Sequence, residues 1–147
     1  MKAKKILLVE DSPDDQELIR MAIEDGHIAN EIVAVSDGVQ ALDYLFGRGA
    51  YAGRDVSDTP LVILLDIKLP KVNGLEVLQQ LRADPRTALI PVVMLTSSNE
   101  ERDILTSYEN GVNSYVRKPV DFDQFTEAVK QLKLYWVILN ETPPDRS

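Results

Sequence analysis

The sequence predicts an α/β fold in which a parallel sheet of five strands is covered by five helices. Short apolar runs alternate along the chain with amphipathic helical patterns, which is typical of a parallel sheet joined by helical crossovers. The run at residues 61–65 has no polar face, so we expect it to be a central strand buried on both sides. A length of 147 residues with 44% hydrophobic residues is enough for one full core.

The strands are expected at residues 5–9, 31–35, 61–65, 91–95 and 113–116. Strand and helix alternating in this order favour the flavodoxin-like doubly wound sheet, with strand order 2-1-3-4-5. Ligands bind such sheets at the carboxyl ends of the strands.

Capping residues mark the helices. Ser12 and Pro13 begin the first helix, Asp14 and Asp15 face the positive end of its dipole, and Gly26 ends it. Its expected buried stripe is Leu18, Ile19, Ala22 and Ile23. The later helices are expected after Asp37 (to about Phe46), Asn73 (with Leu75, Leu78 and Leu81 inward), Asn99 (ended by Gly111) and Asp121 (to about Asn140).

The chain is expected to form one domain, residues 1–140, followed by a frayed tail at 141–147. Residues 47–60 are expected to form a surface loop. A net charge of -8 opposes binding to nucleic acid or to anionic membranes. The absence of cysteine excludes disulfides and thiolate metal sites and fits a cytoplasmic location. No window of the sequence is long and apolar enough to span a membrane.

Polar side chains follow four of the expected strands at one edge of the sheet. Glu10 and Asp11 follow the first strand, Asp66 the third, Thr96 the fourth and Lys118 the fifth. In a parallel sheet these groups converge although they lie far apart in the sequence.

Three crowded carboxylates raise one another's pKa, and a divalent cation removes that conflict. We expect Mg²⁺ (or Mn²⁺), with Asp11 and Asp66 as direct ligands. Glu10 would hold a metal-bound water, and the backbone carbonyl of Lys68 would be the last ligand that the protein supplies to the metal. A carboxylate can also attack a phosphoryl group, so Asp66 is the expected phosphorylation site. Lys118 would supply a second positive charge, and Thr96 a hydroxyl donor, to the phosphoryl oxygens.

Four segments carry a family resemblance: Val9-Glu10-Asp11, residues 65–70 followed by Asn73-Gly74, Leu95-Thr96-Ser97, and residues 115–119. Over nearly its whole length the chain resembles the CheY-like response-regulator receiver domains. The resemblance implies phosphorylation of Asp66 by a histidine kinase and a cis peptide between Lys118 and Pro119. Thr96 and Tyr115 are the expected switch residues, coupling phosphorylation to the surface of the fourth helix.

Residues 101–108, residues 118–125 and the Tyr135-Trp136 pair resemble one subgroup, the single-domain regulators partnered with bacterial and cyanobacterial phytochromes. The resemblance implies a phytochrome-type kinase as partner. The fifth helix has apolar residues outside its inward stripe, namely Leu134, Tyr135, Val137 and Ile138. They predict a homodimer, with the kinase as the alternative occupant of that face.

Three other functions fit these residues less well. A haloacid-dehalogenase-type phosphatase needs a second acid two residues after its nucleophile, where this chain has Lys68. A flavodoxin needs phosphate donors in its first loop, which is acidic here. A receiver-like scaffold that is never phosphorylated would not need the full set of site residues. We therefore expect no enzymatic activity beyond self-phosphorylation and self-dephosphorylation. Because no room remains for an output domain, we expect the signal to leave by protein contact or by draining phosphate from a phosphorelay.

Overall fold

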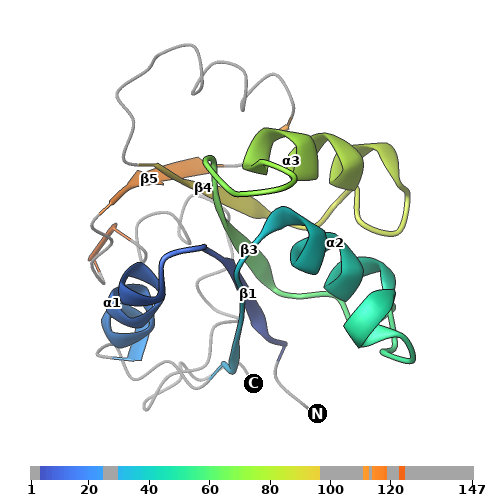
Figure 1. Ribbon diagram of the computed structural model, residues 1–147, viewed down its shortest axis with the longest axis horizontal. Helices are drawn as coiled ribbons and strands as arrows, with labels where there is room; N and C mark the ends of the chain where they lie inside the picture. The colour runs from blue at the N-terminus through green and yellow to red at the C-terminus, as the bar shows by residue number, and fades with distance from the viewer. Residues whose placement is uncertain (1–3, 25–29, 97–110, 113, 119–122, 125–147) are drawn as a thin grey trace, which may run out of the picture.

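The computed structural model describes residues 4–24, 30–96, 111–112, 114–118 and 123–124, without the side chains of Thr96, Ser114, Tyr115 and Arg117. Five parallel strands form one sheet in the order β2-β1-β3-β4-β5 (Figure 1). The strands are β1 (Ile6–Val9), β2 (Ile32–Val35), β3 (Val62–Asp66), β4 (Val92–Thr96) and β5 (Ser114–Arg117). The parallel sheet and its predicted strand order are confirmed.

The register of the central strands determines which residues meet at the carboxyl edge. Val9 of β1 lies opposite Leu65 of β3, and Asp66 lies opposite Leu95 of β4. β3 and β4 each end one residue later than predicted, so Asp66 and Thr96 are the last residues of their strands. The ladder continues past Asp66, because the backbone amide of Ile67 donates to the carbonyl of Leu95 at 3.1 Å.

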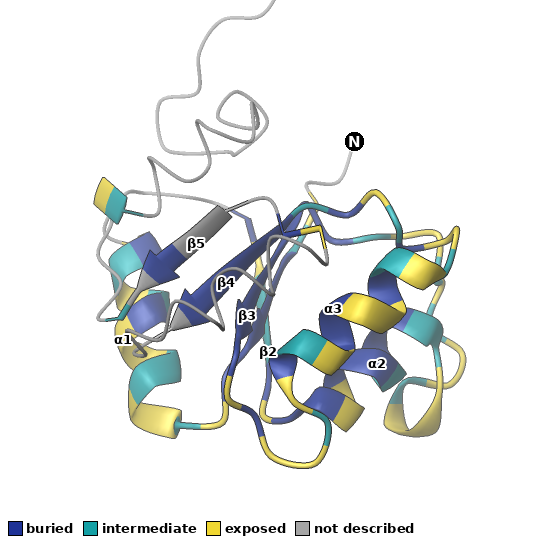
Figure 2. Ribbon diagram, turned by 90° about the horizontal axis from the view of Figure 1, so that it is seen from above, coloured by how far each residue is buried: buried dark blue, intermediate teal, exposed yellow. Residues whose placement is uncertain are grey.

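Helices cover both faces of the sheet. They are α1 (Pro13–Glu24), α2 (Gly38–Phe46) and α3 (Gly74–Ala83), and a short 3-10 turn, η1, spans Gly49–Tyr51. Figure 2 shows α1 on one side of the sheet and α2 and α3 on the other. The expected fourth helix lies outside the described residues, and of the expected fifth only Asp123 and Gln124 are described, both helical.

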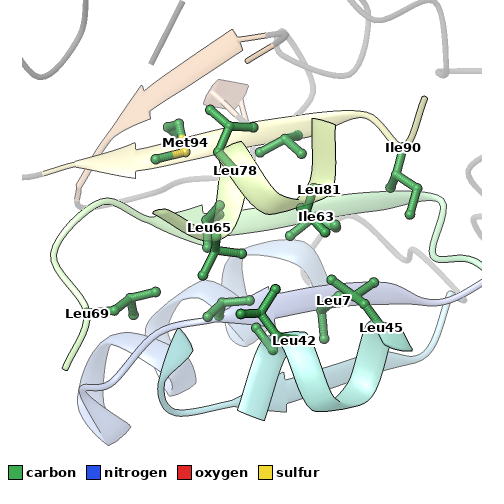
Figure 3. Close-up of a cluster of buried hydrophobic side chains, with 14 of the residues drawn as sticks. Leu7, Leu42, Leu45, Ile63, Leu65, Leu69, Leu78, Leu81, Ile90 and Met94 are labelled. Carbon is green, nitrogen blue, oxygen red and sulfur yellow. The ribbon is translucent and has the colours of Figure 1, made fainter. Parts of the chain in front are cut away.

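The alternation of side chains along β1 and β3 divides the core in two. Leu7 and Ile63 point to α2 and α3, where they meet residues such as Leu42 and Leu78 (Figure 3). The intervening residues of the two strands, with Ile19 and Ile23 of α1, form the second cluster. β1 and β3 are buried on both faces, and their carboxyl ends lie in the middle of the sheet edge.

The predicted buried stripe of α1 was wrong at one position. Ile19 and Ile23 are buried and Ala22 is half-buried, but Leu18 is 54% exposed. Residues four apart form one ridge on a helix, and the Ile19–Ile23 ridge is the one that faces the sheet. Leu18 is turned about 100° from Ile19 and lies beside Met21, which is 49% exposed.

The predicted caps of α2 and α3 are confirmed. The Asp37 side chain accepts a hydrogen bond from the amide of Gln40, and Asn73 and Glu76 form a reciprocal capping box. In α3, Leu78 and Leu81 are buried, whereas Leu75 is only half-buried. These caps determine where the loops after β2 and β3 end.

α3 begins very close to the end of β3. The amide of Gly74 donates to the carbonyl of Ile67 at 2.8 Å. A Cβ atom at Gly74 would lie 2.2 Å from the carbonyl oxygen of Asp66, so a side chain cannot fit there. The loop that follows Asp66 is thus folded tightly back onto the strand that carries it.

The connection at residues 47–60 is exposed in part, as predicted, but it is also tied to the domain. The Arg54 guanidinium lies 3.9 Å from the ring centre of Tyr44. It donates to the carbonyl of Tyr44 at 3.0 Å and to the carbonyl of Asp58. One arginine therefore joins α2 to the second half of this loop.

Candidate functional site

Three carboxylates meet at the carboxyl edge of the sheet. Because β1 and β3 are neighbours in register, Glu10 and Asp66 follow paired residues. One oxygen from each of Glu10, Asp11 and Asp66 lies within 4.8 Å of the others. Glu10 is fully buried and Asp66 nearly so, whereas Asp11 is exposed. The structure thus brings together the acids that the sequence placed at two strand ends.

Backbone and side-chain donors orient these acids. The amide of Ser12 donates to Glu10 Oε2 at 3.1 Å, and the amide of Lys68 donates to Asp66 Oδ1 at 3.1 Å. Gln16 of α1 donates through Nε2 to the backbone carbonyl of Glu10 at 2.6 Å. The acids are therefore held in place by the loops that follow β1 and β3 and by the first turns of α1.

Lys118, which follows β5, reaches across the end of the sheet to the acids. Its ammonium nitrogen lies 2.5 Å from Glu10 Oε1, 2.9 Å from Asp66 Oδ2 and 3.3 Å from Asp15 Oδ2. Its side chain is only 13% exposed. A lysine ammonium has three N–H donors, and here three carboxylates accept from it.

Asp15 is the site residue that sequence reasoning missed. The sequence predicts for Asp15 only an interaction with the helix dipole. In the structure Ser12 caps α1, and the Ser12 hydroxyl oxygen accepts a hydrogen bond from the Asp15 amide at 3.2 Å. A capped first turn at the carboxyl edge of a sheet places its third residue near the strand ends. That position relative to Ser12 was the available indication.

Burial and charge perturb the protonation of this cluster. Burial raises the pKa of Glu10 to about 7, although the hydrogen bond from Lys118 acts in the opposite direction. Burial alone would lower the pKa of Lys118, but the hydrogen bonds to Glu10 and Asp66 outweigh it and raise that pKa. Lys118 is therefore a permanently charged ammonium beside Asp66.

The arrangement fits a small divalent cation. The three clustered carboxylates are the hard oxygen donors that Mg²⁺ prefers. Burial, with a smaller contribution from the neighbouring charge of Asp66, leaves Glu10 poorly stabilised in its charged form. A pocket of about 600 Å³ opens beside Asp11 and is also lined by Lys68 and Asn73. It offers room for the water ligands that Mg²⁺ retains.

The remaining predicted site residues are described in part or not at all. Thr96 is the last residue of β4 and follows Leu95, which pairs with Asp66. Tyr115 of β5 pairs with Met94 of β4. The side chains of Thr96 and Tyr115 are not described. Pro119 lies outside the described residues, as do the proposed interface residues Leu134, Tyr135, Val137 and Ile138.

Residues 6–130 match the family model of the response regulator receiver domain. The chain belongs to this family. Receiver domains serve two-component signalling as switches that accept a phosphoryl group from a histidine kinase, and they bind Mg²⁺ or Mn²⁺. The predicted function, phosphorylation-dependent signalling, is thereby confirmed. The family is in general a signalling family and not an enzymatic one, and the comparisons give no support to the phosphatase or the unphosphorylated scaffold.

Two curated relatives match most of the chain. The probable methanogenesis regulatory protein FilR2 of Methanothrix harundinacea is 42% identical over 139 residues, which cover 94% of this chain and 86% of that protein. The response regulator Rcp1 of Synechocystis is 37% identical over 134 residues, 91% of this chain and 89% of that protein.

Solved structures extend the likeness to phytochrome-associated regulators, as the resemblance predicted. The bacteriophytochrome response regulator RtBRR superposes with a TM-score of 0.86 at 55% identity, covering 97% of this chain and 86% of that chain. The phosphorylated cyanobacterial phytochrome response regulator RcpA superposes with a TM-score of 0.76 at 38% identity, covering 96% of this chain and 100% of that chain. The Mn²⁺-bound form of Rcp1 superposes with a TM-score of 0.75 at 36% identity, covering 97% of this chain and 99% of that chain.

Among the described residues, no helix is both long enough and apolar enough to cross a membrane.

The raised pKa of Glu10 predicts a pH dependence of stability in the metal-free protein. A carboxyl whose pKa is raised by folding contributes stability that is fully present below its unfolded pKa, near 4.5, and is lost as the pH rises through about 7. In chelator, the free energy of unfolding of the wild type should therefore fall by roughly 2–3 kcal/mol relative to Glu10→Gln between pH 5 and pH 8. Urea unfolding at several pH values measures it, and a pH-independent difference would contradict the assignment.

Proposed function

We propose that this protein accepts a phosphoryl group on Asp66 from a histidine kinase, with a bound divalent cation. The observation that carries the proposal is the contact of Lys118 with Asp66 Oδ2 at 2.9 Å inside a cluster of carboxylates. Acids alone would make only a metal site. A buried ammonium beside one of the acids adds the positive charge that a transferring phosphoryl group requires.

Mg²⁺ (or Mn²⁺) is the proposed cofactor, with Asp11, Asp66 and the backbone carbonyl of Lys68 as ligands and Glu10 holding a metal-bound water. When bound, the cation supplies charge to the phosphoryl oxygens and relieves the repulsion among the acids. The exposure of Asp11 and the pocket beside Lys68 support this ligand set.

The proposed chemistry is nucleophilic attack by Asp66. An Asp66 carboxylate oxygen forms a bond to phosphorus as the bond from phosphorus to the kinase histidine nitrogen breaks, and the electron pair remains on that nitrogen. Lys118 stabilises the charge on the phosphoryl oxygens, and the Thr96 hydroxyl donates to one of them. Water later cleaves the aspartyl phosphate to phosphate and the free carboxylate, and self-phosphorylation and self-dephosphorylation are the whole chemistry of the protein in this proposal.

The switch proposed for this site joins Thr96 to Tyr115. A phosphoryl group gives the Thr96 hydroxyl an anionic acceptor and draws the end of β4 inward. The space thus vacated admits the Tyr115 ring, which couples the site to the surface of the fourth helix. Pairing of β4 with β5 beside Met94 supports the proximity that this coupling needs.

The proposed kinase is of the phytochrome type, which the names of the similar solved structures support. We place the protein in the cytoplasm, where such kinases present their phosphohistidine, and the absence of cysteine is consistent with a reducing compartment. Its signal passes on by protein contact, and a net charge of -8 argues against a nucleic-acid partner.

Replacing the proposed acceptor tests the proposal directly. With acetyl phosphate and Mg²⁺, the wild type should gain the mass of one phosphoryl group, and Asp66→Asn should gain none, because an amide oxygen is a poor nucleophile. Intact-mass spectrometry measures both, with the exposed Asp14→Asn as a control that should label fully. Undiminished labelling of Asp66→Asn would refute the assignment, and transfer from candidate kinases would identify the physiological donor.

The apolar residues of the predicted fifth helix support a homodimer as the assembled form. Burial of side chains such as Tyr135 and Ile138 contributes up to about 1.5–3 kcal/mol each, so a partner surface is favoured. Sedimentation equilibrium should show a dimer that becomes a folded monomer in Tyr135→Asp and in Ile138→Asp. A wild type that stays monomeric with and without beryllofluoride would contradict the dimer.

A further inference from the structure

We propose that Asp15 is a positioning residue for Lys118, offering the ammonium a carboxylate that the metal does not use. This inference rests on the function proposed above and extends it. Lys118 and a divalent cation compete for the negative charge of Glu10 and Asp66. Asp15 lets the lysine weaken its contacts to those two acids without losing every anionic partner.

The competition follows from the geometry of the cluster. Lys118 Nζ is bonded to Glu10 Oε1 at 2.5 Å and to Asp66 Oδ2 at 2.9 Å. Glu10 and Asp66 are also two of the three acids whose oxygens lie close enough together to share one ion. A cation entering this cluster withdraws negative charge from the two strongest partners of the ammonium, and the ammonium in turn repels the cation.

Asp15 is in contact with the lysine but stands outside the metal cluster. Its Oδ2 lies 3.3 Å from Lys118 Nζ, whereas the cluster of possible ligands holds only Glu10, Asp11 and Asp66 among the described residues. The Asp15 side chain is 38% exposed, so water solvates its charged form, whereas Glu10 is fully buried. It is therefore the acid best placed to hold Lys118 when a cation occupies the others.

The first turn of α1 keeps Asp15 in this position. The hydroxyl oxygen of Ser12 accepts from the Asp15 amide, and the carbonyl of Ser12 accepts from the Gln16 amide at 2.9 Å. Gln16 also binds the backbone carbonyl of Glu10. The helix that carries Asp15 is thus tied to the strand end that carries Glu10, which keeps both acids within reach of Lys118 Nζ.

Metal affinity tests the role, because a purely structural residue would not link it to Lys118. Isothermal titration calorimetry with Mg²⁺ should show a dissociation constant about fivefold larger for Asp15→Asn than for Asp14→Asn, equivalent to the ~1 kcal/mol typical of a partly exposed ion pair. Asp14 is the matched control, since it lies on the same helix turn, is exposed, and loses the same unit of charge.

The same two substitutions are then made in a Lys118→Met background. Without the ammonium, Asp15→Asn and Asp14→Asn should change the Mg²⁺ dissociation constant by the same factor. Urea unfolding of each variant checks that the fold is retained.

The outcomes separate this inference from the proposed function. The role of Asp15 would be overturned by equal Mg²⁺ affinities of the two single variants. It would also be overturned if Asp15→Asn still weakened Mg²⁺ binding more than Asp14→Asn in the Lys118→Met background. In either case, phosphorylation of Asp66 in the wild type would still support the proposed function. A wild type that binds no Mg²⁺ and takes no phosphoryl group would overturn both.

Discussion

The ammonium of Lys118 is the one cation in contact with the acid cluster in the described part of the chain, and the arrangement of the site depends on it. Glu10 is fully buried at the end of a central strand, where a lone carboxylate would be strongly destabilised. The ion pair with Lys118 offsets part of that cost and joins the loop after β5 to the ends of β1 and β3. A single side chain thus connects segments more than a hundred residues apart in sequence.

This ion pair leaves the site incompletely neutralised. More carboxylates than ammonium groups remain at the sheet edge, and the raised pKa of Glu10 reflects the remaining cost of burial. A cluster of carboxylates with excess negative charge is stabilised by added positive charge and by delocalisation of its negative charge. That property suits a switch, because binding of a cation and transfer of a phosphoryl group then redistribute contacts already made by Lys118.

The sheet and the convergence of the site were predictable because both follow from local patterns. The apolar run at residues 61–65 identified a central strand, and in a parallel sheet the residues after each strand must meet at one edge. Leu18 was misplaced because helical periodicity gives a stripe about as wide as two neighbouring ridges, and only packing against the sheet selects one of them. Asp15 was missed because its spacing from Ser12 indicates only that it lies near the strand ends, and not that the Lys118 side chain reaches it.

A structure of the protein with Mg²⁺ and beryllofluoride, an analogue of the phosphoryl group, would test the roles of Asp66 and Lys118. Beryllium should be bonded to an Asp66 carboxylate oxygen, the cation should be held by Asp11 and Asp66, and Lys118 Nζ should lie within hydrogen-bond distance of a fluorine atom. Beryllofluoride bound to another carboxylate, or a Lys118 that keeps its present contacts to both Glu10 and Asp66 and makes none to fluorine, would contradict these roles.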